Sequence, residues 1–228
     1  MAISIQKLLK FIWRFIRNCM EYNKYVLRYL LFFMLTFFCG CSSHQISFSV
    51  PPAQGVSKKL SFRIGIYIPD SLAHYTTQAI LTGGLCEGHE FQLYIGNGIL
   101  NATLEGAKSI CDNVIMLSAL PDASAMTSQG IKYIVIPEMK ETFANANFSK
   151  TTFSVAIDAK IVEDINVRIS DRSSIQILLK RIHCRGESSG KGEDCHDAAP
   201  YLKKAGEEAM QNLRDSIISR LSSEWLGK

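Results

Sequence analysis

The stretch FSVAIDAKIVEDINVRI, residues 153–169, carries the longest alternation of apolar and polar residues in the chain. A period of two is typical of a β-strand that is buried on one face, and only Glu163 interrupts the apolar face. The pattern fits one long bent strand, or two strands with a break at residues 163–164. A polar turn at 171–174 and the apolar segment 175–184 predict the returning arm of a hairpin.

Shorter segments outside this hairpin also have strand character, namely residues 60–68, 91–95, 114–117 and 131–136. The last of them, IKYIVI, is almost continuously apolar, as in a central strand. Pro137 has no backbone donor and is expected to end that strand or lie at its rim. Residues 71–90 have a weak pattern that predicts a short helix or an irregular loop, and residues 121–130 predict a polar loop.

Two amphipathic helices are expected. Residues 99–112 carry an apolar stripe after Gly96-Asn97-Gly98, with Asn97 as the expected N-cap. A Gly-flanked helix start can bind phosphate, but no Gly-Lys-Ser/Thr or complete GxGxxG motif is present, which favours a turn and cap. After Pro200, apolar residues recur at three- and four-residue steps, predicting a terminal helix of roughly 25 residues. The order of the expected strands and helices along the chain predicts an α+β two-layer sandwich. Its mixed sheet would contain a long hairpin and would be packed by a middle and a C-terminal helix.

The N-terminal region has the features of a secretory leader. Residues 29–38 contain no charge, follow basic residues and precede Gly40 and Cys41. This run is too short to span a membrane, which takes about 20 apolar residues. Residues 38–41, Phe-Cys-Gly-Cys, resemble the lipobox of bacterial lipoproteins. The resemblance implies cleavage after Gly40 and acyl chains, such as palmitate, on Cys41, and Ser42 then implies sorting to the outer membrane. A signal cut elsewhere, or a retained anchor with unmodified Cys41, remains the alternative.

The expected organisation is a signal peptide over residues 1–40, a lipidated flexible tether over 41–59 and a single periplasmic α+β domain over 60–228. The tether is rich in Ser, Pro and Gly, with little apolar matter to fold alone. Met20 opens a leader of ordinary length and is the predicted initiator. If Met1 is used, residues 7–17 form a basic amphipathic helix suited to an anionic membrane surface.

The basic excess of the chain lies in its leader. The chain has 25 Lys and Arg against 21 Asp and Glu, with six of the basic residues and one acidic residue in residues 1–40. The expected mature chain therefore has 19 basic and 20 acidic residues. This near-neutral balance gives no electrostatic reason to expect nucleic-acid binding.

The cysteine count predicts disulfides. Cys19 and Cys39 would leave with the leader and Cys41 would carry lipid. The remaining cysteines, an even number suited to an oxidising compartment, are Cys86, Cys111, Cys184 and Cys195.

Two disulfides are expected among these four cysteines. Cys184 and Cys195 flank the Gly- and Ser-rich segment 185–194, read as a flexible loop, and are predicted to pair. Cys86 and Cys111 would form the second pair. In the alternative, Cys111 is simply a buried residue of the middle helix.

The segment 183–196 also contains four zinc-type donors, in the pairs His183-Cys184 and Cys195-His196. Neighbouring residues on a strand point to opposite faces, and the usual ligand spacings are absent. No metal and no cofactor are expected.

Residues 70–90 contain the candidates for catalysis: His74 and His89 lie near Ser71 and several carboxylates in the sequence. No catalytic motif accompanies them. The chain is therefore expected not to be an enzyme.

The segments IGIYIPD (64–70), ILNATLEGAKSI (99–110) and IKYIVIPEM (131–139), with the long hairpin, give the chain its family likeness. Over residues 60–184 it resembles lipoprotein domains of the YajG type and the amino-terminal domain of TolB. The resemblance implies an assembly or scaffolding role in the cell envelope.

The sequence thus predicts a non-catalytic outer-membrane lipoprotein whose periplasmic domain binds an envelope protein through a sheet edge or a helix groove. One alternative is a carrier of lipid or glycolipid, which would need a broad apolar cavity under the sheet; a scaffold would have a filled core. The less favoured alternative is an envelope hydrolase, in which His74 or His89 would meet a carboxylate and a nucleophile in a concave site.

Overall fold

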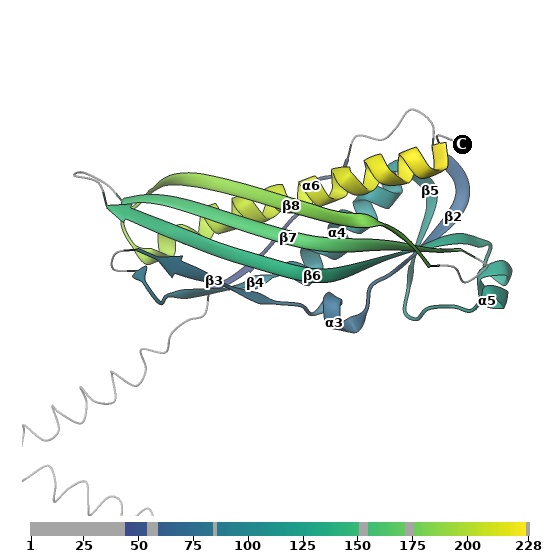
Figure 1. Ribbon diagram of the computed structural model, residues 1–228, viewed down its shortest axis with the longest axis horizontal. Helices are drawn as coiled ribbons and strands as arrows, with labels where there is room; N and C mark the ends of the chain where they lie inside the picture. Colours follow the sequence, from purple (N-terminus) through teal and green to yellow (C-terminus); the bar gives the residue numbers. More distant parts are fainter. Residues whose placement is uncertain (1–43, 54–58, 84–85, 151–154, 172–175, 227–228) are drawn as a thin grey trace, which may run out of the picture. The chain divides into compact units, whose positions relative to one another are not determined.

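The computed structural model describes residues 44–53, 59–83, 86–150, 155–171 and 176–226 (Figure 1). These residues form one mixed eight-stranded sheet with two long helices packed against it. The predicted α+β class, with a middle and a C-terminal helix on a sheet, is confirmed. None of the described helices is long and apolar enough to cross a membrane.

The strands are β1 His44–Ser47, β2 Leu60–Tyr67, β3 Thr77–Thr82, β4 Glu90–Tyr94, β5 Cys111–Leu117, β6 Ile131–Lys150, β7 Val155–Asp171 and β8 Gln176–Gly192. Their order in the sheet is β1-β4-β3-β6-β2-β5, with β7 paired to β6 and β8 paired to β7. The segments in which apolar and polar residues alternate most clearly lie in three long antiparallel strands, β6, β7 and β8. β7 is one strand rather than two.

β6 is far longer than predicted, because it continues through Pro137. Its first residues pair with β2 and its last with β3, both in parallel, while β7 pairs along the other edge. Between Val135 and Asn145 neither β2 nor β3 pairs with β6. A proline is tolerated in a strand where one edge lacks a partner. The prediction that Pro137 ends the strand was therefore wrong.

β8 also continues past its predicted end, through the Gly- and Ser-rich segment that was read as a loop. Gly186 and Ser188 are buried and face the C-terminal helix, α6 Ala198–Leu226. A Cβ atom at Gly186 would overlap the main-chain oxygen of Ala205. The small residues therefore allow the helix to lie directly on the strand, which corrects the loop prediction.

The remaining helices are α3 Asp70–Ala73, α4 Ile95–Ile110, α5 Ala123–Ser128 and the 3-10 turn η2 Cys195–Asp197. α4 begins before Asn97, so Asn97 is not the N-cap that the sequence predicted. Gly96 donates its N–H to the main-chain oxygen of Tyr75 at 3.0 Å, and a Cβ there would overlap the oxygen of Leu72. The glycine serves close backbone packing, not a phosphate turn.

The structure differs from the sequence prediction in two regions. Residues 71–90 begin with a short helix, α3, as one of the two alternatives predicted, but they also contain β3, and α5 occupies part of the predicted loop at 121–130. Asp122 caps α5 by accepting a hydrogen bond from the N–H of Ala125 at 2.7 Å, and this bond lowers the pKa of its carboxyl.

The core is a continuous apolar cluster between the sheet and the helices α4 and α6. Its large, fully buried members include Ile64, Ile66, Leu81, Phe91, Leu93, Ile95, Ile99 and Ile110. A second, smaller cluster under α5 contains Met126, Ile131, Ile134 and Ile136. The sheet is therefore covered on both faces near the start of β6.

Residues 44–53, which the sequence assigned to the tether, belong to the folded domain. β1 lies parallel to β4 in the sheet, with His44 opposite Phe91. Ile46 and Phe48 are buried in the core. We call residues 44–53 the strap: they consist of β1 and the segment after it, which contacts α6 through Ser49 and Pro51. The predicted domain start at residue 60 was wrong on this point.

Candidate binding cleft beside the C-terminal helix

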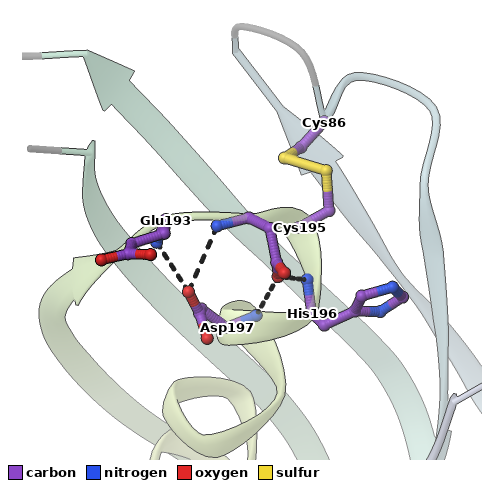
Figure 2. Close-up of a disulfide and its surroundings, with 6 residues drawn as sticks. Cys86, Glu193, Cys195, His196 and Asp197 are labelled. Atoms are coloured by element: carbon purple, nitrogen blue, oxygen red, sulfur yellow. Dashed lines mark hydrogen bonds between the residues drawn. A yellow bond between two sulfur atoms is a disulfide. The ribbon is translucent and has the colours of Figure 1, made fainter.

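The structure joins Cys86 to Cys195, with a Cα–Cα distance of 5.3 Å (Figure 2). Cys111 and Cys184 are buried thiols. Both predicted disulfides, Cys184 with Cys195 and Cys86 with Cys111, were therefore wrong. The reason is the length of β8: it runs on from Cys184 to Gly192, roughly 26 Å at the rise of a strand, and carries Cys195 to the turn between β3 and β4.

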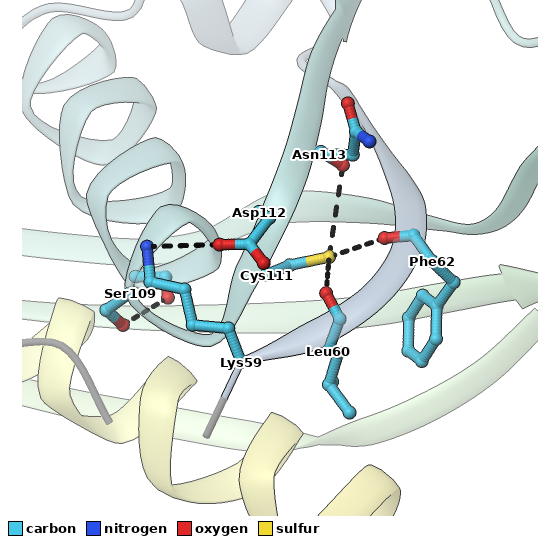
Figure 3. Close-up of polar contacts among 8 residues, drawn as sticks. Lys59, Leu60, Phe62, Ser109, Cys111, Asp112 and Asn113 are labelled. Atoms are coloured by element: carbon cyan, nitrogen blue, oxygen red, sulfur yellow. Dashed lines mark hydrogen bonds and ion pairs between the residues drawn. The ribbon is translucent and has the colours of Figure 1, made fainter. Parts of the chain in front are cut away.

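The structure supports the alternative that Cys111 is a buried thiol, but it places this residue at the start of β5 and not in the middle helix. Its thiol donates to the main-chain oxygen of Phe62 at 2.7 Å (Figure 3). Burial raises the pKa of this thiol. Lys59 and Asp112 form an exposed ion pair beside it, with Nζ and Oδ1 3.7 Å apart. Cys111 thus joins the first residues of β5 to β2.

The chain turns from β8 into α6 through a tight polar turn beside the disulfide (Figure 2). The carboxylate of Asp197 accepts the N–H groups of Glu193 at 2.6 Å and of Asp194 at 3.2 Å, and these bonds lower its pKa. Asp194 in return accepts the N–H of His196 at 2.7 Å. The ring of His196 meets that of His44 edge to face, with centroids 4.5 Å apart. β1, the disulfide and the start of α6 are therefore held together.

The four donors weighed as a metal site do not converge. His183 and Cys184 lie on opposite faces of β8, with Cys184 in the core and His183 exposed. Cys195 is in the disulfide, and His196 contacts His44. In the part of the chain that the structure describes, no three histidine, cysteine or carboxylate groups are placed to hold a metal ion.

The two histidines weighed for catalysis lie at opposite ends of β3. The Nδ1 atom of His74 is 3.2 Å from the main-chain oxygen of Asp70, a local contact at the end of α3. His89 lies in the turn between β3 and β4 that carries Cys86, and its main-chain N–H donates to the main-chain oxygen of Cys86. Their side chains therefore do not share one site.

A polar cleft lies between β8 and the C-terminal half of α6, with a volume of about 560 Å³. Its walls are His183 and Arg185 from β8, and Asn212, Asp215, Ser216, Ser219 and Arg220 from α6. A second hollow of about 540 Å³ adjoins it, where the strap residues 51–53 face α6. The two hollows share Asp215 and Ser219, so together they follow one side of the helix.

Side chains of α6 cover the backbone edge of β8 beside this cleft. Asn212 donates from Nδ2 to the main-chain oxygen of Arg185 at 2.7 Å, and Glu208 accepts the N–H of Glu187 at 3.0 Å. Farther along, the hydroxyl of Tyr201 donates to the oxygen of Lys191 at 2.8 Å. An edge strand that is covered in this way is protected from pairing with another chain over these residues.

The charges in the cleft favour an anionic group. Asp215 is bound to Arg214 on its own helix, with 2.9 Å between Nε and Oδ1. Arg185 donates from Nε to Glu187 at 2.8 Å, but both side chains are about half exposed, so the pair is worth at most about 1 kcal/mol and can be exchanged. Arg220 adds a second guanidinium. Guanidinium groups beside serine hydroxyls suit a carboxylate or a phosphate.

The sequence contains a signal for this cleft on the terminal helix. Asn212, Ser216, Ser219 and Arg220 recur at helical spacing and therefore lie along one side of α6. What the sequence could not show is that β8 reaches far enough to form the opposite wall. Cys41 and Ser42, the proposed lipidation and sorting residues, lie outside the described residues.

No family model matches the chain, and no curated protein matches it. Among solved structures, it is similar to a Xanthomonas campestris protein of family DUF330, with 10% identity and a TM-score of 0.49 over 79% of this chain and 97% of that one. A minor lipoprotein of Acinetobacter baumannii gives 8% identity and a TM-score of 0.39 over 72% and 96% of the two chains. A hypothetical protein of Chlamydia trachomatis gives 12% identity and a TM-score of 0.35 over 72% of this chain and 97% of that one. At these scores the likenesses carry no weight for function.

Proposed function

We propose that the chain is a non-catalytic outer-membrane lipoprotein, anchored through acyl chains on Cys41, whose periplasmic domain binds an envelope protein and holds it in place. The leader and the Phe-Cys-Gly-Cys segment at 38–41 support the anchor, and Ser42 supports the outer membrane as its destination. The presence of a disulfide, Cys86–Cys195, agrees with an oxidising compartment.

The apolar packing of the described core supports a scaffold over a lipid carrier. The space between the sheet and the helices α4 and α6 is occupied by one apolar cluster, with many members fully buried. A carrier would need an apolar cavity there to hold acyl chains. The two hollows beside α6 instead open at the surface. The first is lined by charged, amide and hydroxyl side chains, and the second combines Arg214, Asp215 and Ser219 with the apolar side chains of the strap and Ile218.

The cleft suggests the chemistry of the partner. Arg185 and Arg220 face a space lined by Ser216 and Ser219. A carboxylate from an acidic segment of a protein would replace the weak contact of Arg185 with Glu187 and gain charge-assisted hydrogen bonds. The proposed partner is therefore an envelope protein that presents an acidic segment or a C-terminal carboxylate.

The anchor is tested by the intact mass of the protein extracted from membranes, compared with Cys41→Ala. We expect a chain that starts at residue 41 and carries acyl groups, and a Cys41→Ala protein without them. Reduction of the Cys86–Cys195 disulfide should add about two mass units, one for each sulfur. A wild-type chain that starts elsewhere and carries no lipid would refute the anchor.

A further inference from the structure

We infer that the end of the domain with the Cys86–Cys195 disulfide faces the membrane at close range, and that the cleft beside α6 is held away from it. The inference rests on the lipid anchor at Cys41 in the proposed function. It identifies the surface that lies against the lipid headgroups, which the anchor alone does not define.

The strap is built into the domain by contacts along its whole described length. The Phe48 side chain is 3% exposed and lies against Gly206, where a Cβ atom would overlap its ring. Ser49 donates from its hydroxyl to Glu207 at 2.6 Å. Arg214 donates from Nη1 to the main-chain oxygen of Pro51 at 2.5 Å. Two hydrogen bonds and one buried aromatic ring therefore hold the strap on α6.

This anchoring removes most of the spacer that the sequence suggested. A flexible tether over residues 41–59 would have a root-mean-square length of roughly 24 Å and could present any side of the domain to the bilayer. Because β1 begins at His44, only Ser42 and Ser43 separate it from Cys41. Three Cα–Cα steps reach at most about 11 Å, whatever conformation they adopt.

His44 marks one end of the domain. It stacks on Phe91 at the start of β4, with ring centroids 5.5 Å apart, and its ring meets that of His196. The turn between β3 and β4, carrying Cys86, and the turn before α6, carrying Cys195, are tied to this end by the disulfide (Figure 2). These turns are therefore the part of the domain that the anchor brings to the bilayer.

The charges at this end of the domain oppose its adsorption onto anionic lipid headgroups. In and beside the two turns joined by the disulfide, the exposed charged side chains that the structure describes are Glu87, Glu90, Lys191, Glu193 and Asp194. Carboxylates predominate there, and anionic headgroups repel such a surface within a Debye length of about 8 Å. The domain is thus held near the headgroups by a short covalent link, without being drawn onto them.

α6 extends from this end to the opposite end of the domain. Its 29 residues span about 42 Å at 1.5 Å per residue. Asn212 and Arg220, at the two ends of the cleft, lie about 21 and 33 Å along that axis from its first residue. A partner in the cleft would therefore be held on the periplasmic side of the anchored end.

The test uses the full, lipidated chain in vesicles of phosphatidylethanolamine and phosphatidylglycerol with an acceptor dye on the headgroups. A donor dye is placed on Lys191→Cys at the anchored end, or on Ser128→Cys in α5 at the other end, where β6 begins (Figure 1). Wild-type protein, whose thiols Cys111 and Cys184 are buried, gives the labelling background. We expect energy transfer to be several-fold greater from position 191 than from position 128.

A flexible insert of Gly and Ser between Ser42 and Ser43, about as long as the predicted tether over residues 41–59, should reduce this difference. Equal transfer from the two sites in floating vesicles, or a difference that the insert leaves unchanged, would overturn the orientation. Vesicle flotation separates this from a failed anchor: protein that does not float with the lipid would overturn the proposed function and, with it, this inference.

Discussion

Replacing Phe48 with Ala is expected to lower the free energy of unfolding by about 3–5 kcal/mol, the usual cost of removing a buried phenylalanine ring. The ring is 3% exposed and is held against the backbone of α6 at Gly206. The helix has no side chain at that position that could move into the space. The cavity left by the ring would therefore stay largely open, and the loss of unfolding free energy should lie in the upper part of the range.

The same substitution should release the strap before the rest of the domain unfolds, because it removes the buried ring that packs on α6 at Gly206. Denaturant unfolding gives the change in stability, and limited proteolysis within residues 44–53 reports release of the strap. Pro52→Ala is the matched control, since Pro52 is exposed and should leave both readouts nearly unchanged. A loss below about 1 kcal/mol for Phe48→Ala would show that residue 48 is not packed as described.

Removing the disulfide by Cys86→Ser with Cys195→Ser is expected to cost about 2–5 kcal/mol of stability. The bond closes a loop with a sequence separation of 109 residues, and loops of that order lie near the upper end of the chain-entropy estimate. It also fixes the turn between β3 and β4 against the start of α6, two segments distant in the chain.

Unfolding with and without reductant provides the measurement. Wild-type protein should lose stability on reduction, whereas the double variant should be insensitive to it. Cys184→Ala is the control: it removes a buried thiol outside the disulfide, so the variant should keep its sensitivity to reductant. If the double variant remained sensitive, or if Cys184→Ala abolished the sensitivity, the observed connectivity would be contradicted.

The regular parts of this fold could be predicted because their side chains alternate or recur with a clear period. The hairpin of β7 and β8, the strand that begins at Ile131 and the terminal helix all have long patterns that a single interruption does not hide. β3 was missed because its buried face has only two members, Ala79 and Leu81, and Ala79 is a weak apolar signal. Its exposed residues include Ile80, which obscures the alternation that marks a strand.

Two other misses have one physical cause, the close approach of α6. Gly186 and Ser188 indicated a loop, yet they are small because a helix lies on the strand. Phe48 and Ile46 stood alone among Ser and Pro and indicated a tether, yet each fills a place in the core made by distant residues. A local pattern cannot show which surface a segment will meet, and the cysteine connectivity was missed for the same reason.

Site-specific photo-crosslinking in intact cells tests most directly whether the cleft beside α6 binds an envelope protein. A photoreactive residue at Ser219, exposed in the cleft, is compared with one at Ser128 on α5. We predict one discrete adduct of an envelope protein from position 219, none of the same size from position 128, and loss of the adduct in Arg220→Glu, with the fold of that variant checked by circular dichroism. No adduct at 219, or the same adducts at both positions and unaffected by Arg220→Glu, would contradict the account.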